Sequence, residues 1–146
     1  MKRLTALVSM FFAMSLTILG QESGAPCPEV RYENRNQVDP APLQVKAVSG
    51  KAIDTNSEPV ASACVAIFRD DNRKLVAVAS TGEYGKFVFR NITPGRYRLV
   101  VFIKGLCPSN SIVVLSGKSS GSSKHRRIVV HLRPAAVDDC SFADYT

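Results

Sequence analysis

The chain has 146 residues, of which 45 % are hydrophobic and 21 % are charged. This composition excludes wholesale disorder, because a chain of this length and apolar content can bury a core of its own, and the length favours one domain over two. The formal net charge is +7, a modest basic excess that does not by itself identify a class of partner.

The first 20 residues have the pattern of a secretory signal peptide. Lys2 and Arg3 form a basic start, residues 4–19 form an uncharged apolar run, and small residues follow from Gly20. The sequence turns polar at Gln21, before the run reaches the roughly 20 apolar residues of a membrane-spanning helix. We predict cleavage after Gly20, with an uncleaved anchor or a lipid-modified Cys27 as the alternatives. The mature chain would carry a formal charge of +5, from 17 basic and 12 acidic residues, and would be secreted or held in the periplasm or cell envelope without a membrane span.

All four cysteines, Cys27, Cys64, Cys107 and Cys140, lie in the part predicted to be exported. In an oxidising compartment an even number of cysteines favours two disulfides. The spacing is wide and never C-x-x-C, which argues against a zinc site or a thioredoxin-type redox pair. Three pairings are open. Our hypothesis joins Cys64 to Cys107 inside the domain and Cys27 to Cys140 between the two tails.

Taken in chain order, residues 21–42 are proline-rich and aperiodic, and we interpret them as an extended lead-in. A domain follows over residues 43–134. It contains seven short stretches with the two-residue alternation of β-strands, near residues 43–47, 60–69, 74–80, 87–89, 96–103, 112–115 and 127–133. The third stretch is apolar on both sides and is therefore predicted to be a central strand. Residues 135–146 are assigned to a C-terminal tail, and no helical period is visible in the mature chain.

The turns carry more specific expectations. Pro94 and Gly95 predict a type II turn, because proline presets the first central position and glycine accepts the positive φ of the second. Seven strands separated by such turns are typical of a β-sandwich.

Two motifs resemble the carboxypeptidase regulatory-like domain family. Residues 48–65, VSGKAIDTNSEPVASACV, follow the family pattern V-x-G-x-V-x-D-x-x-G-x-P-V-x-G-A-x-V, and residues 85–101, GKFVFRNITPGRYRLVV, follow G-x-F-x-F-x-x-L-x-P-G-x-Y-x-L-x-V. Ser57 and Ser62 stand where the family has glycine. If those positions need a positive φ, Asn56 or a different turn type must absorb the strain.

The resemblance implies an all-β fold, a seven-stranded antiparallel sandwich of prealbumin-like (transthyretin-like, Ig-like) type. It also implies a non-catalytic accessory or interaction module, of a fold also described as carbohydrate-binding-like. It supplies no catalytic residues, and a fold alone does not establish a ligand.

The residues themselves offer little catalytic chemistry. His125 and His131 are the only histidines, and no G-x-S-x-G motif is present. The run Asp70-Asp71-Asn72 lacks the alternating ladder of a calcium loop and is interpreted as a hairpin tip. We therefore predict no enzyme, no cofactor and no metal site.

Ligand contact remains open at three residues. Arg96 and Arg98, together with the basic run 124–127, could form either a face for an acidic envelope or matrix polymer or a solvated strand edge, and export disfavours nucleic acid. Tyr84, predicted at a turn tip, is the best aromatic candidate for contact with a glycan. The predicted function is an exported, non-catalytic structural or interaction module whose partner is an envelope or extracellular protein or glycan. The alternative is a carbohydrate- or small-ligand-binding module of the cell envelope.

Overall fold

The computed structural model describes residues 27, 30, 41–117, 126–134 and 141–146. These residues form nine strands and no helix: β1 (Leu43–Val45), β2 (Ser49–Ile53), β3 (Cys64–Arg69), β4 (Leu75–Ser80), β5 (Lys86–Val88), β6 (Gly95–Phe102), β7 (Ser109–Leu115), β8 (Ile128–His131) and β9 (Phe142–Tyr145). The predicted signal peptide, most of the lead-in and Cys140 lie outside the described residues.

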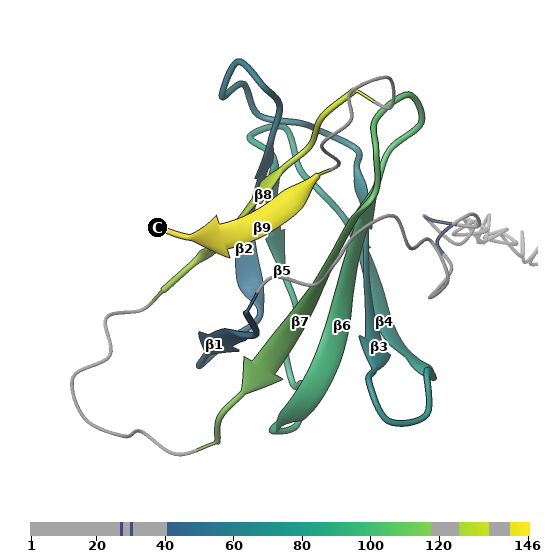
Figure 1. Cartoon of the computed structure of the whole chain (residues 1–146), viewed down its shortest axis with the longest axis vertical. Coiled ribbons are helices and arrows are strands. Elements are labelled where there is room, and N and C mark those ends of the chain that lie inside the picture. Colours follow the sequence, from purple (N-terminus) through teal and green to yellow (C-terminus); the bar gives the residue numbers. More distant parts are fainter. Residues whose placement is uncertain (1–26, 28–29, 31–40, 118–125, 135–140) are drawn as a thin grey trace, which may run out of the picture.

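Two sheets pack face to face, as Figure 1 shows. The first has five strands in the order β1-β7-β6-β3-β4, and the second has four in the order β5-β2-β8-β9. The predicted all-β sandwich is confirmed. The sheets are mixed rather than purely antiparallel, because β1 pairs with β7 and β2 with β8 in parallel. The strand β9 lies within the predicted C-terminal tail and pairs antiparallel with β8.

The core lies between the sheets and follows the predicted alternation. Along β3, Val65 and Ile67 face the core, while Ala66 and Phe68 belong to a separate buried cluster on the outer side of the five-stranded sheet. Tyr97 on β6 is fully buried, and its hydroxyl donates to the carbonyl of Thr93 at 2.6 Å, so the one polar atom of this large core side chain has a partner.

The position of β4 corrects the prediction of a central strand. This strand pairs with β3 on one side only and forms an edge of the five-stranded sheet. Both of its faces are apolar for another reason: Ala77 and Ala79 pack on the core, and Val78 packs with Val30 on the outer side. Leu75 and Val76 stay exposed, at 49 % and 40 %.

The left-handed backbone positions differ from those predicted. Gly95 has no positive φ and begins β6, so the predicted type II turn is wrong, and Asn91 takes the positive φ (59°) instead. Asparagine tolerates this region because its short polar side chain can bond locally. Ser57 (φ 66°) and Ser62 (φ 58°) adopt the left-handed conformation themselves, although the sequence had suggested that Asn56 or another turn would absorb it.

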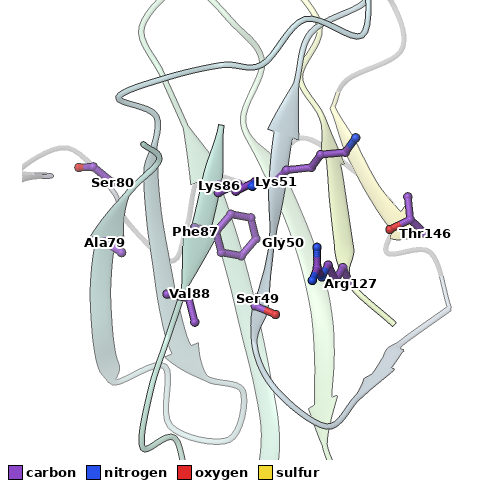
Figure 2. Close-up of a pocket in the computed structure, with 10 residues that line it drawn as sticks. All are labelled: Ser49, Gly50, Lys51, Ala79, Ser80, Lys86, Phe87, Val88, Arg127 and Thr146. Atoms are coloured by element: carbon purple, nitrogen blue, oxygen red, sulfur yellow. The ribbon is translucent and has the colours of Figure 1, made fainter. Parts of the chain in front are cut away.

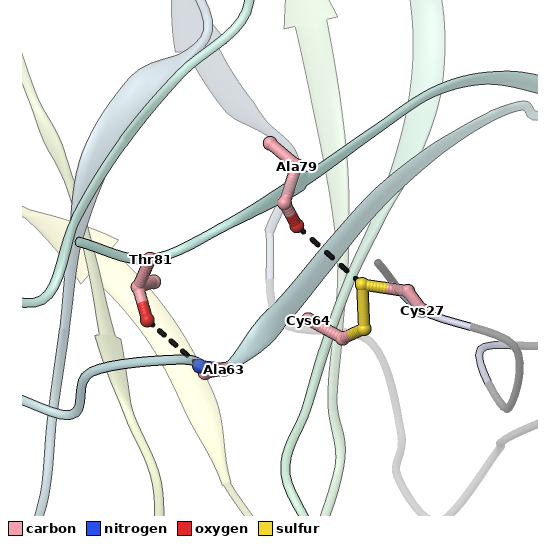
Figure 3. Close-up of a disulfide and its surroundings, with 5 residues drawn as sticks. All are labelled: Cys27, Ala63, Cys64, Ala79 and Thr81. Carbon is pink, nitrogen blue, oxygen red and sulfur yellow. Dashed lines mark hydrogen bonds between the residues drawn. A yellow bond between two sulfur atoms is a disulfide. The ribbon is translucent and has the colours of Figure 1, made fainter. Parts of the chain in front are cut away.

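The structure joins Cys27 to Cys64, with their Cα atoms 5.5 Å apart, and the predicted pairs Cys64–Cys107 and Cys27–Cys140 are wrong (Figure 3). Cys64 alternates with the core residue Val65 and so lies on the outer side of β3, where a core partner could not reach it. The Cys27 sulfur also lies 3.6 Å from the carbonyl oxygen of Ala79. A disulfide sulfur carries no proton, so this is a packing contact, and the disulfide holds Cys27 beside β3 and β4. Cys107 is also disulfide-bonded.

Candidate functional site: a basic hollow on the four-stranded sheet

A hollow with a volume of about 780 Å³ lies beside the edge strand β5, between residues of the four-stranded sheet and the end of the edge strand β4 of the other sheet. Its walls come from β2, β4, β5 and the residues that flank β8 and β9 (Figure 2). The lining residues are Ser49, Gly50, Lys51, Ala79, Ser80, Lys86, Phe87, Val88, Arg127 and Thr146. Ligand pockets commonly range from about 300 to 1,000 Å³, so the hollow has room for a small organic molecule.

The charge of this hollow follows from strand register. Lys51 on β2 pairs directly with Lys86 on β5, and both alternate with core residues, so their side chains reach the outer face. Arg127 directly precedes Ile128, whose partner on β2 is Gly50. The lining contains three cationic side chains and no Asp or Glu. Across the described residues, none of these three cations has an ion-pair partner.

Gly50 sets the floor of the hollow. A Cβ atom there would overlap the carbonyl oxygen of Ile128 and would lie 2.9 Å from Cζ of Phe87. The position therefore requires glycine, because β8 and the Phe87 ring approach its backbone too closely for any side chain.

Two of the predicted ligand contacts lie elsewhere. Arg96 and Arg98 are on β6, in the other sheet, and both bind Asp70: Arg96 Nε donates to Oδ2 at 2.7 Å, and a terminal nitrogen of Arg98 lies 3.4 Å from Oδ1. Arg98 is only 8 % exposed and also donates to Oδ1 of Asn110 at 3.0 Å. Arg98 therefore serves a buried polar network. Of the predicted basic face, Arg96 and Arg98 lie on the five-stranded sheet and Arg127 precedes β8 of the four-stranded sheet, while residues 124–125 lie outside the described part of the chain.

The Asp70 carboxyl responds to these neighbours. Its partial burial acts to raise its pKa, but the hydrogen bonds and positive charges of Arg96 and Arg98 outweigh that effect and hold the pKa below its ordinary value. The sequence pattern predicts a hairpin tip at Asp70 and gives no sign of this role in an ion-pair network. The available signal was the end of the preceding strand, because Arg69 at the end of β3 pairs with Tyr97 on β6 and so brings Asp70 beside Arg96 and Arg98.

Tyr84, the third predicted ligand contact, lies in the turn before β5 and is 68 % exposed. The Lys86 ammonium lies 5.9 Å from the centroid of its ring. The pair therefore links this exposed aromatic side chain to a residue that lines the hollow, and ligand contact by Tyr84 stays a prediction.

His131 points outward from β8, as predicted, and is half-buried against Phe142, with the two ring centroids 4.5 Å apart. Its Nε2 lies 3.1 Å from Oδ1 of Asp144. Catalysis by a cysteine nucleophile would need a free thiol, and the three cysteines in the described part of the chain are disulfide-bonded.

Within the described ranges, no group of three or more His, Cys, Asp or Glu side chains could hold a metal ion. The same ranges contain no helix of the length and hydropathy needed to cross a membrane.

Comparison with known proteins agrees with this architecture. The carboxypeptidase regulatory-like domain matches residues 47–123, more than half of the chain. The structure of 5-hydroxyisourate hydrolase from Klebsiella pneumoniae, a transthyretin-like fold, is similar with a TM-score of 0.50 and 14 % identity over 68 % of this chain and 98 % of that one. That likeness concerns the fold alone.

A second structure, 3-chlorocatechol 1,2-dioxygenase from Rhodococcus opacus 1CP, is more distant, with a TM-score of 0.36 and 8 % identity over 77 % of this chain and 70 % of that one. No curated protein matches the chain. The two sequence motifs, the sandwich and the match over residues 47–123 agree, and the chain belongs to the carboxypeptidase regulatory-like domain family of non-catalytic β-sandwiches.

Proposed function

We propose that the chain is an exported, non-catalytic interaction module of the carboxypeptidase regulatory-like type. The observation that carries the proposal is the state of the cysteines: Cys27, Cys64 and Cys107 are all disulfide-bonded. Disulfides persist in oxidising compartments outside the cytoplasm. Together with the signal-peptide pattern of residues 1–20, this supports secretion or a place in the periplasm or cell envelope.

The surface of the sandwich supports an interaction role. Its large exposed apolar side chains gather on or beside the two edge strands β4 and β5: Leu75, Val76, Val88 (54 % exposed) and Tyr84. An edge strand with apolar, uncharged residues is suited to contact with another molecule. β4, with the sequence LVAVAS, has no charged residue to block such contact.

The proposal is tested on protein recovered from its native cells. The expected polypeptide comes from the culture fluid or envelope, lacks about the first 20 residues by intact mass, and has no titratable thiol. A photoreactive residue at Leu75 should crosslink to a partner, and the same residue at exposed Lys46 should not. Intact, unprocessed chain in the cytoplasm with reactive thiols would contradict export, and equal crosslinking from both positions would contradict the edge as contact surface.

The second candidate is a carbohydrate- or small-ligand-binding module of the cell envelope. The basic hollow beside Lys51 and Lys86 favours it, because a concave site with a few polar groups above an apolar floor is the usual form of a ligand pocket. Titration with a panel of glycans separates it from a module that binds protein alone.

A further inference from the structure

The two lysines that line the hollow, Lys51 and Lys86, form an electrostatically unfavourable pair. Lys51 and Lys86 occupy directly opposite positions on neighbouring strands, where like charges repel and destabilise a sheet. The nearest acidic side chain in that row of the sheet is Asp144, which lies two strands beyond Lys51 through Val129 and is already bound to His131. An anion placed between the two ammonium groups would relieve the repulsion.

The remaining lining narrows the kind of anion. Ser49, Ser80 and Thr146 contribute hydroxyl groups, while Val88, Phe87 and Ala79 contribute apolar surface. Three cations, three hydroxyls and an apolar wall suit a ligand that has carboxylates, hydroxyls and C–H surface in the same molecule. Acidic sugars have this combination.

The backbone around the hollow argues against other anions. The residues that form the floor of the hollow pair with one another in the ladders of β5 with β2 and of β2 with β8. Because their main-chain groups are used in this pairing, a ligand would be recognised mainly by side chains. A peptide added as a further strand beside β5 would have to do without the Lys86 carbonyl, which already accepts from Gly82 N–H at 3.0 Å. Phosphate is favoured by cradles of backbone N–H groups and by clustered arginines, and the lining contains a single arginine.

We propose that the basic hollow binds an acidic oligosaccharide of the uronic-acid type, with Lys51, Lys86 and Arg127 holding its carboxylates. Carboxylates on successive sugar rings reach the lysine pair and Arg127 in turn, and the hydroxyl groups of the sugar meet Ser49 and Thr146. This inference deepens the second candidate function and depends on it.

The test is calorimetric titration of the disulfide-bonded protein with tetragalacturonic acid at low salt. The double variant Lys51→Gln/Lys86→Gln should bind at least about tenfold more weakly than the wild type. The matched control Lys46→Gln/Lys74→Gln removes two exposed lysines outside the hollow and should change the dissociation constant less than about twofold. The thermal midpoint of the double variant should equal or exceed that of the wild type, because a like-charge pair is lost.

Several results would overturn the proposal. Neutral maltotetraose binding as tightly as the uronate would remove the role of charge, and an equal loss in the control variant would indicate non-specific attraction. Tighter binding of tetraglutamate would assign the hollow to acidic peptides. If the double variant fails to fold, Arg127→Gln must show the loss instead, and unchanged affinity there would also contradict the proposal. A failed titration of a protein that is still exported and oxidised would leave the interaction module standing.

Discussion

The outer faces of the two sheets use similar cationic side chains in opposite ways. On the five-stranded sheet, Arg96 and Arg98 converge on Asp70, and Val30 packs over a small apolar cluster. On the four-stranded sheet, Lys51 and Lys86 occupy directly opposite positions on neighbouring strands and have no acidic partner among the described residues. A cationic side chain with an acidic partner in the protein stabilises the fold, whereas one without such a partner is available to a ligand. The residue type alone does not show which of the two applies.

Removing the disulfide should have the largest effect, because it releases Cys27 and the nearby Val30 from the outer side of the five-stranded sheet. Cys27 and Cys64 are 37 residues apart, and closing a loop of that size contributes about 3–4 kcal/mol in the chain-entropy model. The variant Cys27→Ser/Cys64→Ser should lose about that much free energy of unfolding in urea titrations at matched pH. A loss below about 1 kcal/mol would show that this crosslink contributes little to the stability of the folded chain.

Breaking the ion-pair network should cost less. Asp70→Asn leaves the buried Arg98 without its carboxylate, and we expect a loss of about 2 kcal/mol, below the value for a fully buried pair because the Asp70 side chain is 18 % exposed. The control Asp71→Asn changes an exposed neighbour and should stay within about 0.5 kcal/mol. Equal effects of the two variants in denaturant titrations would remove the distinction between the faces.

The ion pairs of Asp70 with Arg96 and Arg98 predict that the free energy of unfolding depends on pH in the acid range. The folded-state pKa of Asp70 is lowered from an ordinary value of 3.8, so its contribution is fully present above that value and is lost as the pH falls through the folded pKa. The free energy of unfolding should therefore fall below about pH 4 more steeply in the wild type than in Asp70→Asn. Parallel curves for the two proteins from pH 6 to pH 2 would contradict this assignment.

On the outer face of the four-stranded sheet, a charge change should stabilise the protein instead of destabilising it. Lys51→Glu replaces a repulsive cross-strand pair with an attractive one opposite Lys86, and the free energy of unfolding should rise by about 0.5–1 kcal/mol. Lys46→Glu makes the same charge change at an exposed position outside the strands and should have a smaller effect. A destabilised Lys51→Glu would mean that Lys51 and Lys86 do not repel each other in the folded protein.

Much of the fold could be predicted because the alternation of core-facing and outward-facing side chains along a strand depends only on the sequence of that strand. Val65 and Ile67 face the core as their alternation with Ala66 and Phe68 indicates. The errors concern relations between strands. An apolar stretch such as β4 looks central whether its outer side meets another strand or a segment such as Val30, and β9 has only four residues in a region that gives no local signal.

The candidate site was harder to predict, for the same physical reason. Lys51 and Lys86 are 35 positions apart, and only the register of β2 with β5 brings them together. Arg98 has the same charge and the same alternating pattern as Arg96, and its burial depends on Asp70, in the turn after β3, and on Asn110 of β7. Cysteine pairing depends likewise on which side of β3 Cys64 faces.

The obligatory glycine at position 50 has a consequence for how this surface can vary. The backbone of β8 and the Phe87 ring leave no room for a side chain at position 50. Substitution at this position therefore cannot be used to change the shape of the hollow. Diversification of binding preference must take place at the rim, where Lys51, Val88 and Arg127 can be exchanged without moving a strand. A library that randomises those three positions, with residue 50 held fixed, would sample new selectivities on an unchanged frame.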